Sequence, residues 1–172
     1  MLNSNKTTSK GVKLSVGIAD MVVVKGCNQE IITHALGSCV GVTIFDPIAG
    51  VGGLLHYMLD RPRTEARASE HPVAMYATLG VPELFREAYK LGATKERMIV
   101  CAAGAAEMLG HGSALKIGKR NQVMLRKLLW KNDITLVAED TGGSDARTMS
   151  LSMRSGAVDI HCRNSRSTLW TP

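Results

Sequence analysis

Short aliphatic segments separated by turn-forming residues constrain this fold more than any other feature of the sequence. Four of them, rich in Val, Ile, Leu or Met, occur early in the chain, at 14–25, 30–34, 40–45 and 53–58. β-Branched residues favour strands, and Asp46-Pro47 is typical of a turn. We therefore expect strands here, with the last two forming a hairpin whose loop contains several residues.

The rest of the chain combines helices with further strands. One helix is predicted over 73–91, where Gly80 and Pro82 interrupt the pattern, and a second over 119–130, because apolar residues recur at helical spacing in both. Further strands are predicted at 98–103, 134–138, 148–153 and 157–162, and loops at 60–72 and 104–118. The 60–72 segment is polar and carries two prolines, so we expect a mobile loop of the kind that often serves function. Two main helices among seven or eight strands indicate an α/β or α+β domain.

Length and composition fit one folded domain. The chain has 172 residues, of which 45% are apolar, enough for a single hydrophobic core. The first fourteen residues hold no apolar signal segment, and the most membrane-like stretch, 40–59, is broken by Asp46-Pro47 and glycines. Four cysteines without a C-x-x-C pair are expected to be reduced thiols: Cys27, Cys39, Cys101 and Cys162. We expect a soluble, cytoplasmic protein without direct membrane insertion.

The tripeptide Gly37-Ser38-Cys39 is the first candidate for chemistry. It lies between two predicted strands, where a tight turn can lift a side chain out of a sheet, and its small residues leave room for a substrate carbonyl. Backbone N–H groups in such a turn could stabilise an oxyanion. A cysteine attacks as its thiolate and therefore needs a base or a positive neighbour. The alternative is a buried structural cysteine.

His56 supplies the base that such a cysteine needs. If 40–45 and 53–58 pair antiparallel, the His56 end of the second strand lies near Cys39, at the start of the first. A Cys–His pair can attack acyl carbons, and a third group should orient the imidazole. Thr33 is a candidate for that third group through its hydroxyl or its carbonyl. The alternatives are a core histidine with satisfied hydrogen bonds and an ordinary β-branched strand residue.

These residues, together with later motifs, resemble the CheD family of chemoreceptor glutamine deamidases. The resemblance runs from about residue 15 to 160. It rests on the order of Gly-Ser-Cys, a histidine 17 residues after the cysteine, Ile-Gly-Lys-Arg-Asn at 117–121 and Ala-Glu-Asp-Thr-Gly-Gly at 138–143. Thr33 to Val40, Asp46-Pro47, Gly53, His56 to Leu59 and Ala146-Arg147 also match. Asp60 departs from the family pattern, which has proline there, as do Ala103-Gly104-Ala105 and Gly80-Val81-Pro82.

The resemblance implies a fold, a reaction and partners. The fold is a layered α/β sandwich of antiparallel and mixed strands over 14–163, between a flexible tail at 1–13 and a C-terminal tail at 164–172. The reaction is hydrolysis of glutamine side-chain amides on chemotaxis receptors, which makes the chain a cysteine-dependent protein-glutamine glutaminase. Cys39 falls on the family's nucleophile, His56 on its base and Thr33 on its third residue, with Gly37 and Ser38 in the turn that holds the oxyanion. No cofactor is implied, and the partners are the receptors and a CheC-type phosphatase that competes with them.

Two other functions are alternatives to deamidation. A non-catalytic chemotaxis adaptor would bind receptor or phosphatase without needing a thiol beside an imidazole. A nucleic-acid binder could use the net charge of +6 and the basic run at 111–132, but only 4% of residues are aromatic and can stack on bases. A metal site is not expected either, because His71, His111 and His161 lack ligand spacing.

Overall fold

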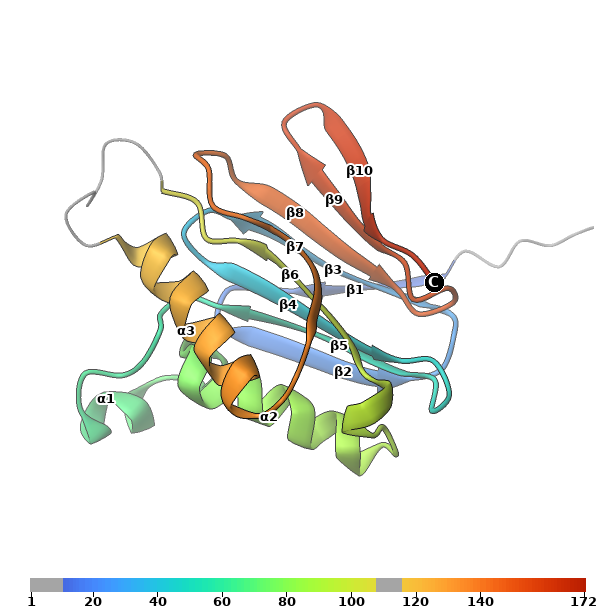
Figure 1. The fold of residues 1–172 in the computed structure, drawn as a ribbon, viewed down its shortest axis with the longest axis horizontal. Coiled ribbons are helices and arrows are strands. Elements are labelled where there is room, and N and C mark those ends of the chain that lie inside the picture. The colour runs from blue at the N-terminus through green and yellow to red at the C-terminus, as the bar shows by residue number, and fades with distance from the viewer. Residues whose placement is uncertain (1–10, 108–115) are drawn as a thin grey trace, which may run out of the picture.

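The computed structural model describes residues 11–107 and 116–172, whose strands form two stacked sheets (Figure 1). The first has the order β1-β3-β8-β9-β10, with β1 Val12–Val16, β3 Gln29–Leu36, β8 Arg147–Ser152, β9 Val158–Cys162 and β10 Ser165–Trp170. The second has the order β2-β5-β4-β6-β7, with β2 Asp20–Lys25, β5 Val51–Tyr57, β4 Val40–Asp46, β6 Ile99–Gly104 and β7 Leu136–Thr141. The β1–β3 and β6–β7 pairs are parallel and the other neighbours antiparallel. The expected mixed sheets are therefore confirmed.

The helices cover one face of the second sheet, so the molecule has three layers (Figure 1). α2, Ala77–Lys90, and α3, Ile117–Lys131, bury their apolar sides against β4, β5 and β6. One core cluster fills this helix–sheet layer and a second fills the space between the sheets. The layered α/β sandwich with two main helices is confirmed. None of the described helices has the length and hydropathy needed to span a bilayer.

The predicted helix at 73–91 consists of a 3₁₀ turn, Val73–Met75, followed by the uninterrupted α2. Pro82 lies inside α2 and does not end it. Gly80 fits because the helix approaches its neighbours closely at this point. An added Cβ would lie 3.1 Å from both Ala74 Cα and Leu55 Cδ1. The glycine therefore serves packing against β5 and does not break the helix.

Several expected boundaries differ in the structure. The run at 14–25 forms β1 and β2, which belong to different sheets and are separated by a turn in which Ala19 has φ 58°. The expected loop at 60–72 contains a short helix, α1, Glu65–Glu70. The expected C-terminal tail from 164 was wrong over 165–170, which forms β10 paired antiparallel with β9. Most of the tail at 1–13 and the middle of the loop at 104–118 lie outside the described residues.

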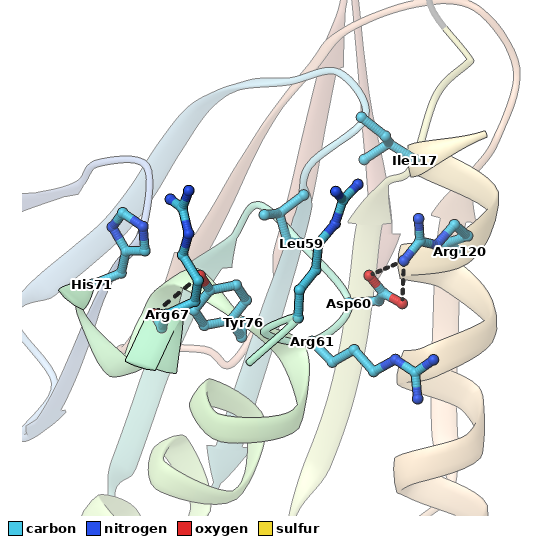
Figure 2. Close-up of a pocket in the computed structure, with 9 residues that line it drawn as sticks. Leu59, Asp60, Arg61, Arg67, His71, Tyr76, Ile117 and Arg120 are labelled. Carbon is cyan, nitrogen blue, oxygen red and sulfur yellow. Dashed lines mark hydrogen bonds and ion pairs between the residues drawn. The ribbon is translucent and has the colours of Figure 1, made fainter. Parts of the chain in front are cut away.

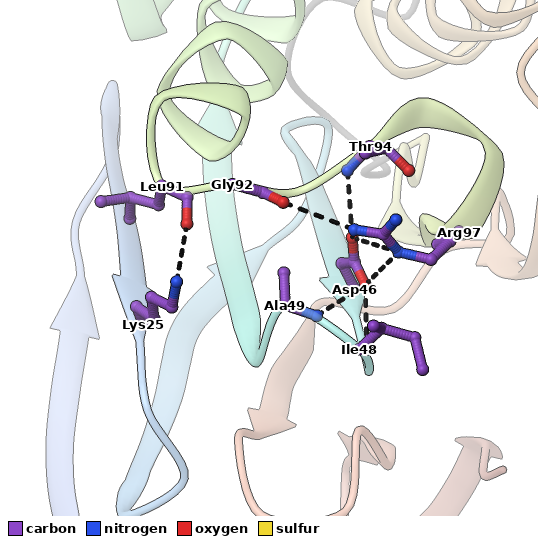
Figure 3. Close-up of polar contacts among 8 residues, drawn as sticks. All are labelled: Lys25, Asp46, Ile48, Ala49, Leu91, Gly92, Thr94 and Arg97. Atoms are coloured by element: carbon purple, nitrogen blue, oxygen red, sulfur yellow. Dashed lines mark hydrogen bonds and ion pairs between the residues drawn. The ribbon is translucent and has the colours of Figure 1, made fainter.

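The turn after β4 is fixed by the buried carboxylate of Asp46 (Figure 3). It accepts hydrogen bonds from the backbone N–H groups of Ile48 and Ala49, 3.0 Å each, and from that of Thr94, also 3.0 Å. The Arg97 guanidinium completes the set with an ion pair of 2.8 Å. The β4–β5 hairpin is thereby joined to the segment that leads from α2 into β6.

Candidate active site

The β4–β5 hairpin sets the relation between Cys39 and His56. The strands pair antiparallel, with Val40 opposite Tyr57 and Gly41 opposite His56. The β4–β6 pairing continues to Cys39, whose carbonyl accepts the Ala105 N–H at 2.8 Å. Residues directly opposite share a face, as do residues two apart on a strand. Cys39 is thus the diagonal neighbour of His56 on one face, and Gly41, which has no side chain, lies between them.

That face points into the layer between the two sheets. Cys39 belongs to the core cluster there together with Leu54, which precedes His56 by two residues. His56 is completely buried, whereas Cys39 is 9% exposed, the largest exposure in this cluster. The thiol therefore lies at the rim of the layer and the imidazole just inside it. No hydrogen bond joins His56 Nε2 to Cys39 or to any other described residue.

Thr33 reaches His56 from the opposite sheet. Its hydroxyl oxygen lies 2.8 Å from His56 Nδ1 and 2.7 Å from the carbonyl oxygen of Val16. A hydroxyl has one proton, and a carbonyl oxygen can only accept, so the Thr33 O–H donates to Val16. Thr33 Oγ1 must then accept from Nδ1–H. This places the ring proton on Nδ1 and leaves Nε2 as an unprotonated base.

The turn that carries Cys39 is held by its carbonyl groups. The Gly37 carbonyl accepts from Ala106 N–H at 2.8 Å, that of Ser38 from Asn121 Nδ2 at 2.9 Å and that of Cys39 from Ala105 N–H at 2.8 Å. The N–H groups of Ser38 and Cys39 donate to no carbonyl or side chain of another described residue. The three carbonyl groups of the turn are therefore held in place, while the N–H groups of Ser38 and Cys39 remain available as hydrogen-bond donors near the sulfur.

Asn121 is the residue whose role the sequence did not reveal. It is completely buried at the start of α3, and its Nδ2 donates to the carbonyls of Ser38 and of Met58, at 2.9 and 2.8 Å. The backbone carbonyl of Asn121 accepts a hydrogen bond from the Tyr57 hydroxyl at 2.9 Å. One amide thus connects the cysteine turn to the strand end that carries His56. The 117–121 motif was the available signal, but it did not indicate these contacts.

Burial favours the neutral forms of Cys39 and His56. It raises the pKa of the Cys39 thiol above its ordinary value, although the residue's own backbone N–H acts in the opposite direction. It lowers the pKa of His56 to about 4. At neutral pH the site therefore holds a thiol and a neutral imidazole, not a preformed ion pair. A sulfur in this state could act as a nucleophile only if its proton moved to Nε2 during the attack.

The other histidines and cysteines named from the sequence lie in separate parts of the described structure. Within residues 11–107 and 116–172, no group of three His, Cys, Asp or Glu side chains is placed to hold a metal ion. His71 and His161 lie apart, on the segment after α1 and on β9, and His111 lies outside the described residues. Cys101 is buried in the core between the sheets, and burial raises its pKa to about 11.

Comparison with known proteins places the chain in a family. The family model described as CheD chemotactic sensory transduction matches residues 58–162, more than half of the chain. A protein of Solibacter usitatus is 44% identical over 147 residues, covering 85% of this chain and 86% of its own length. Proteins of Syntrophus aciditrophicus and Pyrococcus horikoshii are each 41% identical, over 84% and 85% of this chain and 91% and 90% of their own lengths. All three carry the name "Probable chemoreceptor glutamine deamidase CheD", the second with the number 1. The chain belongs to the CheD family.

Proposed function

We propose that this chain deamidates specific glutamine side chains of chemotaxis receptors, giving glutamate and ammonia, with Cys39 as nucleophile, His56 as base and Thr33 as the residue that orients the base. The family and the names of its relatives support the reaction class. The observation that carries the residue assignment is the Thr33–His56 hydrogen bond, because it leaves Nε2 unprotonated on the face that also holds Cys39. An adaptor that only docked partners would not need a base oriented in this way.

The reaction proceeds in two halves. Cys39 Sγ attacks the γ-amide carbon while His56 Nε2 takes the thiol proton, and the carbonyl oxygen becomes an oxyanion. The N–H groups of Ser38 and Cys39, in the turn begun by Gly37, stabilise this charge. His56 then gives its proton to the departing ammonia, and a γ-glutamyl thioester remains. Water, activated by the same nitrogen, cleaves the thioester to glutamate and restores the thiol. The sum is amide plus water giving carboxylic acid plus ammonia, with no cofactor.

The proposed partners follow from this activity. The substrate is the helical region of the receptors that lies in the cytoplasm, so the chain acts there. A CheC-type phosphatase is the second proposed partner, and it would compete with receptor for the same site. Neither nucleic-acid binding nor membrane insertion is part of the proposal.

Cysteine replacement tests the assignment. A chemoreceptor cytoplasmic fragment is incubated with wild type, Cys39→Ala or Cys101→Ala, and the fragment is analysed by mass spectrometry for the one-dalton gain at glutamine and for released ammonia. Cys39→Ala should lose both signals and keep its fold, because Cys39 forms no disulfide and lies at the edge of the core, 9% exposed. Cys101→Ala, which removes a thiol from the same core, should remain active. Deamidation by Cys39→Ala would overturn the mechanism.

A further inference from the structure

The structure contains an arginine-rich pocket of about 300 Å³ (Figure 2). Its walls come from the segment after β5, the region around α1 and the first turn of α3. Four arginines, one aspartate and one histidine line it: Arg61, Arg63, Arg67, Arg120, Asp60 and His71. With the histidine neutral, four positive charges against one negative charge leave a net charge of +3.

Most of this charge is not neutralised by ion pairs with the described residues. Asp60 pairs with Arg120, whose Nη2 lies 2.9 and 3.0 Å from the two carboxylate oxygens. Arg67 has only an exposed contact of 3.7 Å with Glu70. Arg61 and Arg63 make no side-chain hydrogen bond or ion pair with the described residues, a property that only Arg154 shares among the described arginines. The pocket thus presents guanidinium groups ready for an outside anion.

The pocket is connected to the cysteine turn through neighbouring residues of the chain. Asn121, which holds the carbonyls of Ser38 and Met58, directly follows Arg120 in α3. Asp60 follows Met58 by two residues, which span at most about 7 Å. The segments that contain Met58 and Asn121, which are hydrogen-bonded to each other beside the cysteine turn, therefore also contribute Asp60 and Arg120 to the pocket.

The positive charge is spread out and not focused on one point. Arg61, Arg63 and Arg120 also line an adjoining hollow of about 430 Å³ with Pro62. Two neighbouring hollows that share three arginines suit several separate carboxylates better than one compact anion. A helix can present several separate carboxylates on one surface, because side chains three, four and seven residues apart share one face.

We propose that this pocket binds acidic side chains of the substrate, and that it selects glutamines with Glu or Asp one or two helical turns away on the same face. This rests on the proposed deamidase function and deepens it, since the pocket then decides which glutamines reach Cys39. The guanidinium groups attract an acidic helix and set its register, and the glutamine enters the site next to the turn. Residues of the pocket act in specificity and not in the chemical steps.

The test compares two helical peptides that share one central glutamine. The acidic peptide has glutamates three, four and seven residues from it on the same face, and the neutral peptide has serines there. Wild type should deamidate the acidic peptide with a kcat/KM about tenfold higher, and added salt should reduce this preference. In the variant R61Q/R63Q/R67Q the ratio of the two kcat/KM values should fall toward one. The matched control R154Q/R163Q/R166Q removes three arginines from the other sheet and its turns and should keep the wild-type ratio.

Each outcome separates this proposal from the function on which it rests. Equal kcat/KM values for the two peptides with wild type, or an unchanged ratio in the pocket variant, would overturn acidic recognition while deamidation stands. Equal rates together with competition by inorganic phosphate would assign the pocket to a compact anion and also overturn it. No deamidation of either peptide or of the receptor fragment by wild type would remove the deamidase function itself, and the docking proposal with it.

Discussion

Thr33 Oγ1 lies 2.8 Å from His56 Nδ1, and this contact between the two sheets determines what the imidazole can do. The Val16 carbonyl, 2.7 Å from the same oxygen, takes the only hydroxyl proton. The ring must therefore donate through Nδ1 and keep Nε2 free. One hydroxyl thus sets the tautomer and the orientation of a buried base, as a carboxylate does in other Cys–His and Ser–His sites.

Replacing Thr33 by valine tests this role, since valine keeps the shape and removes the hydroxyl. The Nδ1–H would lose its acceptor inside a fully buried site, which costs about 1–3 kcal/mol of stability. The imidazole could then adopt the other tautomer, so kcat/KM on the receptor fragment should fall about tenfold to a hundredfold. Thermal unfolding and initial rates of ammonia release measure the two effects.

Thr33→Ser is the matched control, because it restores the hydroxyl at the same atom. This variant should recover most of the lost kcat/KM, although the missing methyl group should still lower the stability somewhat. A valine variant that is less stable but turns over at the wild-type rate would show that Thr33 supports only the packing between the sheets.

The relation of Cys39 to His56 could be predicted from the sequence because it is local. The two residues belong to one hairpin, and antiparallel pairing alone brings the end of β5 to the start of β4. The Thr33 contact crosses between two sheets, and residue patterns do not encode how sheets stack. Spacing alone therefore favours an ordinary β-branched strand residue at Thr33, and only the family resemblance assigns it a role.

Other features were missed for identifiable physical reasons. β10 is an edge strand with mostly exposed, polar residues, so it lacks the apolar alternation that predicts a strand. The split of 14–25 into β1 and β2 depends on a left-handed Ala19, a conformation that alanine rarely adopts. The contact of Asn121 with Ser38 joins residues 83 positions apart and follows from how α3 packs on the second sheet.

The pH dependence of the reaction should reflect the burial of His56. Burial lowers its pKa to about 4, so Nε2 stays unprotonated, and able to act as a base, down to about that pH. The acidic limb of kcat/KM should therefore have its midpoint near pH 4 and not near 6.5, the ordinary value for histidine. Rates are measured with circular dichroism at each pH to verify folding. A midpoint at or above 6.5 would contradict a neutral resting pair.

The same burial predicts a loss of stability in mild acid. Below pH 6.5 the unfolded chain binds a proton on His56 that the folded chain does not take up until about pH 4. The contribution of neutral His56 to the free energy of unfolding is thus fully present above pH 6.5 and is lost as the pH falls from 6.5 toward 4. His56→Asn, which does not titrate, should show a smaller decrease in its free energy of unfolding across this window. If the free energy of unfolding fell equally steeply with pH in wild type and variant, the acid sensitivity would come from residues other than His56.

Gly104 is predicted to be essential for the position of the cysteine turn. It has φ 108°, and an added Cβ would overlap the carbonyl oxygen of Cys39. Gly104→Ala should displace that carbonyl from the Ala105 N–H and lower both activity and stability. Gly142→Ala is the control, because Gly142 also has a positive φ, 87°, but nothing lies within 4 Å of the added Cβ. If Gly142→Ala lost as much activity as Gly104→Ala, the effect would come from backbone strain alone and not from overlap with the Cys39 carbonyl.

Asp46 should contribute stability that disappears only in strong acid. Burial alone would raise its pKa, but the hydrogen bonds from Arg97 and from the N–H groups of Ala49, Thr94 and Ile48 outweigh it and lower the pKa to about 2, from 3.8. A lowered pKa stabilises the folded state above pH 3.8, and this contribution, about 2 kcal/mol, is lost as the pH falls through 2.

Asp46→Asn should lower the free energy of unfolding by about that amount at pH 7 and flatten its decline between pH 4 and 2. Glu87→Gln, which breaks an exposed pair with Lys90, serves as the control and should change stability little. If Asp46→Asn were as stable as wild type at pH 7, the carboxylate would not be what joins the β4–β5 turn to the segment before β6.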